Sequence, residues 1–127
     1  MYNERLEGNE KVRIPYIAPC VNRMSWFVYV VRLNQEIDRN RVINYLRENG
    51  VECKTYFEPI HLHLFYRKMF EYKKGDFPVT EDVAERTIAL PFFNNLKEEQ
   101  IDYVVEKLKE GVRMNMEGKV EVVCDDQ

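Results

Sequence analysis

The chain has 127 residues, of which 45% are hydrophobic and 32% charged, a composition typical of one folded domain that buries about two-thirds of its unfolded surface. Nineteen basic and twenty-two acidic residues leave a formal net charge of −3, so we expect no general nucleic-acid binder, because such binding needs a cationic surface. No apolar run approaches the ~20 residues that span a bilayer, and no signal peptide stands at the start, so we expect a cytoplasmic protein without a membrane partner. The cysteines Cys20, Cys53 and Cys124 are odd in number and lack CxxC spacing, which indicates reduced, mostly buried thiols.

The first half of the chain predicts a helix between two extended segments. Residues 1–22 contain charges and two prolines, and we interpret them as a short helix followed by an extended lead-in. The aromatic and β-branched stretch 26–33 predicts a strand that is central in its sheet. Asp38 predicts the N-cap of a helix that Asn49-Gly50 ends. The apolar face of this helix comprises Val42, Ile43 and Leu46.

The middle of the chain predicts a second strand, a short helical segment and a further helix. Residues 51–58 alternate between apolar and polar types, which predicts a strand that Pro59 ends. The aromatic stretch 60–77 predicts one or two helical turns against a neighbour. Thr80 predicts the N-cap of a helix whose inner stripe comprises Val83, Ala84, Thr87 and Ile88.

The last third predicts a short strand and a long helix. Residues 89–93 contain a proline, so a strand there should be short or lie at a sheet edge. Apolar residues at i, i+3, i+4, i+7 and i+11 from Ile101 predict a helix that Gly111 or Gly118 ends. Residues 119–124 alternate weakly, as an edge strand would. The order β-α-β-α-β-α predicts an α/β (α+β) domain, a small β-sheet with helices mainly on one face.

Two histidines raise the question of a metal site. His61 and His63 are the only histidines and follow Glu58 closely. On an extended backbone residues i and i+2 point to the same side, so the pair could hold a metal ion with Glu58 or Asp76. However, no spacing places a third ligand, and paired histidines beside aromatic residues more often serve packing. We therefore expect no metal site.

The sequence contains no catalytic motif. Ser25 is the only serine, and the five glycines form neither GxGxxG nor a P-loop. Cys53 falls on the apolar side of its stretch, so we interpret it as a buried structural thiol. We therefore predict no catalytic residue and no cofactor-binding residue in this chain.

Six motifs stand in order along the chain. They are S-W-F-V-Y-V-V-R-L (25–33), R-x-x-V-I-x-Y-L-R-E-N-G-V (39–51), Y-F-E-P-I-H-L (56–62), F-Y-R (65–67), G-D-F-P-V-T-E (75–81) and A-L-P-F-F-N-N-L (89–96). Together they closely resemble the C-terminal small domain of the DegT/DnrJ/EryC1/StrS family of pyridoxal-phosphate-dependent sugar aminotransferases, which are fold-type I transferases. The resemblance implies a lead-in from a missing large domain at 1–22, the small domain at 23–113, and a tail at 114–127.

The resemblance also implies an activity for a parent enzyme. Such an enzyme transfers an amino group from an amino acid, typically glutamate, to a nucleotide-linked keto-sugar, with pyridoxal phosphate as the electron sink. The family's cofactor lysine belongs to the large domain, and none of Lys54, Lys68, Lys73 and Lys74 stands in its context. We therefore expect an inactive fragment of a parent that is a cytoplasmic homodimer.

By the same resemblance, His61 is the best candidate to contact substrate, and Tyr56 is the second. Glu58 departs from the family pattern, which often has proline or a neutral residue there, and Lys97 stands where Ser or Thr would cap the last helix. The alternative is a free-standing α/β binding or regulatory module that self-associates through its aromatic segment, residues 65–72.

Overall fold

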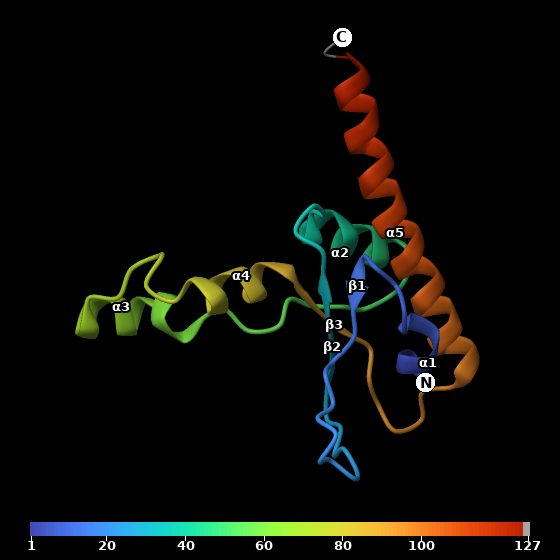
Figure 1. Ribbon diagram of the computed structural model, residues 1–127, viewed down its shortest axis with the longest axis horizontal. Helices are drawn as coiled ribbons and strands as arrows, with labels where there is room; N and C mark the ends of the chain where they lie inside the picture. Colours follow the sequence, from blue (N-terminus) through green and yellow to red (C-terminus); the bar gives the residue numbers. More distant parts are fainter. Residues whose placement is uncertain (126–127) are drawn as a thin grey trace.

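The computed structural model describes the backbone of residues 1–125 and the side chains of residues 1–117. Along these residues a small sheet lies beside a bundle of helices, and one pair of helices extends away from both (Figure 1). The elements are α1 (Tyr2–Leu6), β1 (Val12–Arg13), β2 (Tyr29–Leu33), α2 (Arg39–Glu48), the 3₁₀ helix η1 (Ile60–Leu62), α3 (Leu64–Phe70), α4 (Pro78–Arg86), β3 (Thr87–Leu90) and α5 (Glu98–Asp125).

The strands form one antiparallel sheet in the order β1-β2-β3, so β2 is central, as the stretch 26–33 predicts. Alternation along β2 buries Tyr29, Val31 and Leu33 on one face and leaves Val30 and Arg32 half-buried on the other. The buried face packs against α1, α2 and α5, so the expected arrangement of helices mainly on one face is confirmed. The core comprises Tyr2, Leu6, Val12, Tyr29, Val31, Leu33, Ile37, Val42, Ile43, Leu46, Val51, Cys53, Ile88, Leu90, Ile101, Val104, Val105, Leu108 and Val112.

Helix α2 begins and ends where the sequence predicts. The Asp38 carboxylate accepts hydrogen bonds from the backbone N–H groups of Asn40 (3.0 Å) and Arg41 (3.4 Å), which satisfies two free donors of the first turn. Gly50 has φ of +80°, a left-handed conformation that glycine adopts without strain and that turns the chain after the helix. Both ends of α2 therefore follow from local interactions.

Residues 51–58 do not form the predicted strand. Val51 and Cys53 are buried as the alternation predicts, but a single bridge joins Lys54 to Ala89, with N···O distances of 3.3 and 2.8 Å. Strand β3 is four residues long, and beyond Lys54 the chain leaves its edge toward η1 and α3 (Figure 1). The ladder therefore ends after one residue pair.

The boundary between α4 and β3 differs from the prediction. Helix α4 begins at Pro78, so Thr80 lies within its first turn and is not the N-cap. Proline has a helical φ and lacks the N–H that a first helical residue leaves free, which makes Pro78 the better start. Thr87 and Ile88 belong to β3 and not to the helix stripe, because they pair with Arg32 and Val31 of β2.

Helix α5 is longer than predicted, because neither Gly111 nor Gly118 ends it. A Cβ atom on Gly111 would lie 3.0 Å from Tyr45 Cδ1, so this glycine permits α2 to approach α5 closely. The helix also continues through residues 119–124, where the sequence predicts an edge strand. At its start the Gln100 side chain accepts from the backbone N–H of Lys97 (2.9 Å), half of a capping box that offsets the absent Ser or Thr.

The residues from 60 to 77, here called the aromatic arm, extend away from the sheet (Figure 1). Helix α3 confirms the predicted helical turns, but it buries none of its own residues. Its exposed apolar residues are Leu64, Phe65, Tyr66, Met69 and Phe70. In this chain the arm therefore presents an apolar surface without the neighbour that the sequence predicts.

Three smaller observations complete the fold. Tyr2, Leu6 and Val12 lie in the core, so the first part of the predicted lead-in packs with this domain, while the proposed boundaries at residues 22 and 113 stay predictions. Cys20 is exposed, contrary to the expectation of mostly buried thiols, and the side chain of Cys124 lies outside the described residues. In the described part of the chain no helix is long and apolar enough to cross a membrane.

Candidate functional site

Tyr56 lies in a small cleft between residues 55–59 and helix α4. The side chain is half-buried, and its ring lies against Phe57 with centroids 4.8 Å apart. The cleft has a volume of about 260 Å³. Its lining residues are Arg39, Thr55, Tyr56, Phe57, Glu58, Pro59, Leu62, Lys74, Glu81, Ala84 and Glu85. Basic and acidic side chains therefore both line the cleft around Tyr56.

His61 does not line this cleft and is buried beside it, with 6% of its surface exposed. Its Nε2 atom lies 3.6 Å from Glu81 Oε2, too far for a hydrogen bond, and has no hydrogen-bond partner among the described residues. The rings of Phe77 and Tyr72 meet the imidazole edge-on, at centroid distances of 4.8 and 6.4 Å. His61 is thus enclosed by the aromatic arm and by one carboxylate.

Glu81 joins His61 to the cleft. It is buried, lines the cleft, and accepts from the backbone N–H of Gly75 with both carboxylate oxygens at 2.9 Å. Gly75 has φ of +100°, so the turn that presents this N–H requires glycine. Sequence reasoning missed Glu81 as a site residue, because no local signal identifies its contact with His61.

The structure does not bring together the metal ligands that the sequence could offer. His61 lies in η1 and is buried, whereas His63 is exposed and its Nε2 lies 3.3 Å from the backbone oxygen of Glu58. Asp76 accepts from the backbone N–H of Lys73 (2.9 Å). Among the residues whose side chains are described, no three His, Cys, Asp or Glu residues lie close enough to hold a metal ion.

Four of the lysines whose side chains are described do not fit pyridoxal phosphate, the cofactor that the family resemblance implies. Lys54, Lys68, Lys73 and Lys74 are all exposed, whereas a cofactor lysine needs a pocket around the group that it holds. Lys74 does line the cleft, but Glu58, Glu81 and Glu85 line it too, and three carboxylates would repel a phosphate. No step of a reaction is therefore assigned to the cofactor here.

Cys53 has the structural role that the sequence predicts. The side chain is buried, and its Sγ lies 3.9 Å from the Ile43 carbonyl oxygen. Burial raises the pKa of the Cys53 thiol, although the nearby positive charge of Arg47 acts in the opposite direction. A raised pKa lowers the thiolate fraction, so Cys53 is a poor nucleophile.

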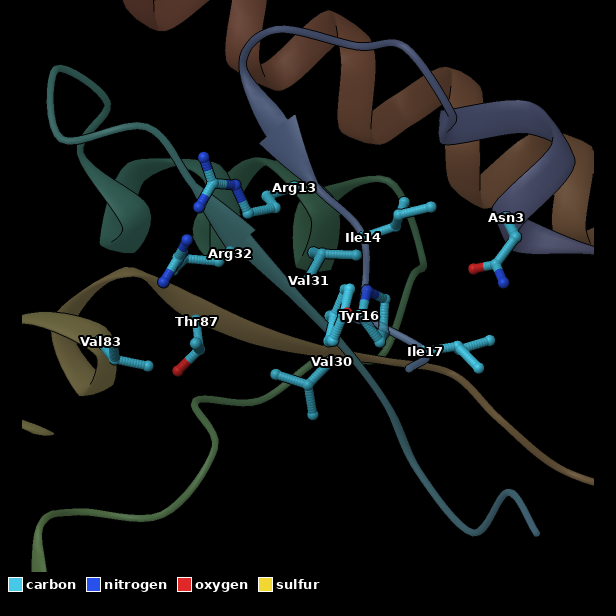
Figure 2. Close-up of a pocket in the computed structure, with 11 residues that line it drawn as sticks. Asn3, Arg13, Ile14, Tyr16, Ile17, Val30, Val31, Arg32, Val83 and Thr87 are labelled. Atoms are coloured by element: carbon cyan, nitrogen blue, oxygen red, sulfur yellow. The ribbon is translucent and has the colours of Figure 1, made fainter. Parts of the chain in front are cut away.

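A second hollow, of about 710 Å³, lies on the face of the sheet opposite the main core (Figure 2). The guanidinium groups of Arg13 and Arg32 extend to the same side of the sheet, with Thr87 beyond Arg32. Apolar side chains from the segment after β1 and from β2 line the rest, including Ile14, Ile17 and Val30. Sequence reasoning missed this site, because a two-residue strand such as β1 has no alternation to detect.

Comparison with known proteins points to one family. The model of the DegT/DnrJ/EryC1/StrS aminotransferase family matches residues 1–109. MJ1066, an uncharacterized protein of Methanocaldococcus jannaschii, is 37% identical over 118 residues, which are 91% of this chain and 30% of MJ1066. SpsC, a spore coat polysaccharide biosynthesis protein of Bacillus subtilis, is 30% identical over 104 residues, which are 76% of this chain and 27% of SpsC.

Solved structures agree with the sequence match. The aminotransferase TlmJ from Streptoalloteichus hindustanus has a TM-score of 0.75 and 25% identity to this chain, and the match covers 89% of this chain and 29% of TlmJ. The chain therefore spans between 27% and 30% of the length of these three relatives.

Proposed function

We propose a function for this chain from one premise: the chain belongs to the DegT/DnrJ/EryC1/StrS aminotransferase family, whose model matches residues 1–109. In this proposal it serves as the C-terminal small domain of a pyridoxal-phosphate-dependent sugar aminotransferase and has no transaminase activity alone. The observation that carries the proposal is this match together with the span of about 30% of MJ1066. The exposure of Lys54, Lys68, Lys73 and Lys74 supports the same conclusion.

The proposed reaction belongs to the assembled enzyme. It moves an amino group from an amino acid, which we propose to be glutamate, to a keto-sugar attached to a nucleotide. Pyridoxal phosphate would supply the electron sink when bound, and the protein would supply position and electrostatics. The printed name of SpsC, which places that relative in polysaccharide biosynthesis, supports a sugar substrate. A cytoplasmic homodimer is part of the same proposal.

Within that enzyme, Tyr56 and His61 are the proposed substrate contacts of this chain. Tyr56 lines the cleft, so its hydroxyl is available to a bound sugar as donor or acceptor. His61 is separated from the cleft by Glu81, so a contact with substrate would require the aromatic arm to move. Tyr56 is therefore the more direct contact of the two.

A chimera tests the proposed function. This chain replaces the matching 118 residues of MJ1066, and pyridoxal phosphate uptake is measured for the chimera, for natural MJ1066 and for the isolated chain. We expect uptake by the first two, because the proposal places the cofactor lysine in the large domain, outside the exchanged part. For the isolated chain, borohydride reduction followed by mass spectrometry should show only scattered labelling of exposed lysines, as with pyridoxal alone. One stoichiometric adduct on a single lysine of the isolated chain would contradict the proposal.

The second candidate function is a free-standing module that self-associates. The exposed apolar residues of α3, among them Phe65 and Met69, favour it, because such a patch on a soluble domain marks an interaction surface. This reading needs no large domain. The oligomeric state of the isolated chain tests this second candidate.

A further inference from the structure

Arg13 and Arg32 are direct neighbours across two strands. The register of the sheet pairs Arg13 of β1 with Arg32 of β2, and Arg32 in turn with Thr87 of β3. Lys54 pairs with Ala89, two residues after Thr87 in β3, and therefore lies on the same face of the sheet. Like charges directly opposite each other destabilise a sheet, so a pair of arginines at this register calls for a compensating anion.

The described part of the chain does not supply that anion. No Asp or Glu lines the hollow beside Arg13 and Arg32, and neither guanidinium has an ion pair or a side-chain hydrogen bond among the described residues. The carboxylate of Asp82 acts on Arg32 only at a distance and is bound to Arg86 at 2.6 Å. Burial lowers the pKa of Arg32, and the charges of Arg13 and Arg86 lower it further. The two arginines therefore lack a counterion among the described residues.

The surroundings of the pair favour a polypeptide over a small anion. The hollow has a largely apolar lining, and exposed apolar side chains continue beyond it along the segment between β1 and β2. Tyr16 is 83% exposed and Phe27 is 77% exposed. A phosphate would satisfy the two charges but would leave this apolar surface in water, whereas a protein surface covers both.

We infer that the open face of the sheet docks a protein surface that presents a carboxylate to Arg13 and Arg32 and apolar side chains to the hollow. The occupant is the part of the aminotransferase fold that lies outside this chain, because the chain matches only 30% of the length of MJ1066. The guanidinium groups of Arg13 and Arg32 suit the binding of a carboxylate, because a guanidinium can donate two parallel hydrogen bonds to the two carboxylate oxygens. The inference rests on the proposed function and adds to it the docking face, the anchoring residues and the chemistry of the partner.

The MJ1066 chimera tests the inference in the variants Arg13→Gln, Arg32→Gln and the double variant. Arg113→Gln is the matched control, because Arg113 is an exposed arginine on α5, on the helical side of the sheet. Hydroxyl-radical oxidation of Tyr16 is the direct readout, since Tyr16 lines the hollow and is exposed in the isolated chain. We expect Tyr16 oxidation to fall several-fold in the chimera, to return in the double variant, and to stay low in the control.

The thermal midpoint is a second readout, which the double variant should change in opposite directions in the isolated chain and in the chimera. In the isolated chain the double variant removes the repulsion between two arginines, so the thermal midpoint should rise by about 2 °C. In the chimera the same variant should lower the midpoint, because it removes the partner of a buried carboxylate. A merely structural role for the arginines would give the same sign in both.

The other outcomes separate the inference from the proposed function. If Tyr16 is protected in the chimera and equally in the double variant, the arginine anchor is wrong while the domain role stands. If Tyr16 is oxidised as in the isolated chain although the chimera takes up pyridoxal phosphate, the docking face is wrong. If the chimera neither protects Tyr16 nor takes up the cofactor, the proposed function itself fails.

Discussion

At the scale of single residues, the contact between His61 and Glu81 is the main finding. The resemblance makes His61 the leading substrate contact. In this chain, however, His61 is buried beside the carboxylate of Glu81, which accepts a hydrogen bond from the backbone N–H of Gly75. A buried polar group without a partner costs free energy, so Glu81 and the Gly75 N–H, which are joined by hydrogen bonds of 2.9 Å, depend on each other. Glu81 therefore contributes to stability through the turn at Gly75.

Replacing Glu81 tests this dependence. Glu81→Ala should lower the free energy of unfolding by about 1–3 kcal/mol, because it leaves the Gly75 N–H without its acceptor and removes the carboxylate that lies beside the imidazole of His61. Glu81→Gln should cost less, since the amide oxygen can still accept from Gly75. Glu85→Ala is the control, because Glu85 is exposed on the same helix. Urea unfolding followed by circular dichroism measures all three, and equal midpoints for Glu81→Ala and Glu85→Ala would contradict the role.

At the scale of elements, the packing of α2 against α5 decides where the last helix ends. Glycine at position 111 weakens a helix by about 1 kcal/mol relative to alanine, and for this reason the sequence favours a helix end there. In the structure the close approach of Tyr45 and Val42 uses the missing side chain. The contact between two elements thus outweighs the local preference of one residue.

Gly111→Leu tests the importance of this close approach. Leucine gains helix propensity, but its Cβ would lie only 3.0 Å from Tyr45 Cδ1, and its longer side chain would need space that Tyr45 and the fully buried Val42 occupy. We expect a net loss of about 1–3 kcal/mol in the free energy of unfolding. Arg113→Leu, an exposed change on the same helix, should be nearly neutral. A Gly111→Leu variant as stable as the natural chain would show that the helices can separate without cost.

At the scale of the whole molecule, the chain leaves two surfaces uncovered, the open face of the sheet and the aromatic arm. The proposed aminotransferase role assigns the first surface to the remainder of the enzyme. The second candidate function assigns the arm to a second copy of the chain. Both surfaces expose apolar side chains, such as Tyr16 beside the sheet and Phe65 on the arm, and this exposure is the physical reason to expect a partner.

Sedimentation of the isolated chain tests the self-association that the second candidate predicts. Under that candidate the natural chain sediments as a dimer or larger species at micromolar concentrations, and the double variant Phe65→Ser/Met69→Ser sediments as a monomer. Met114→Ser is the control, because Met114 is equally exposed but lies on α5, away from the arm. A natural chain that stays monomeric at every concentration would remove the second candidate and leave the domain role.

The sequence by itself determined the family, the central strand and the bounds of α2. The motifs and capping residues that carry this information, such as Asp38 and Asn49-Gly50, act on neighbours a few residues away. Only the tertiary structure decided that Thr87 and Ile88 form a strand, that α5 continues past Gly111, that Glu81 meets His61, and that Arg13 faces Arg32. These features depend on contacts between residues far apart in the chain, and the free energy of such contacts is not encoded in any local pattern.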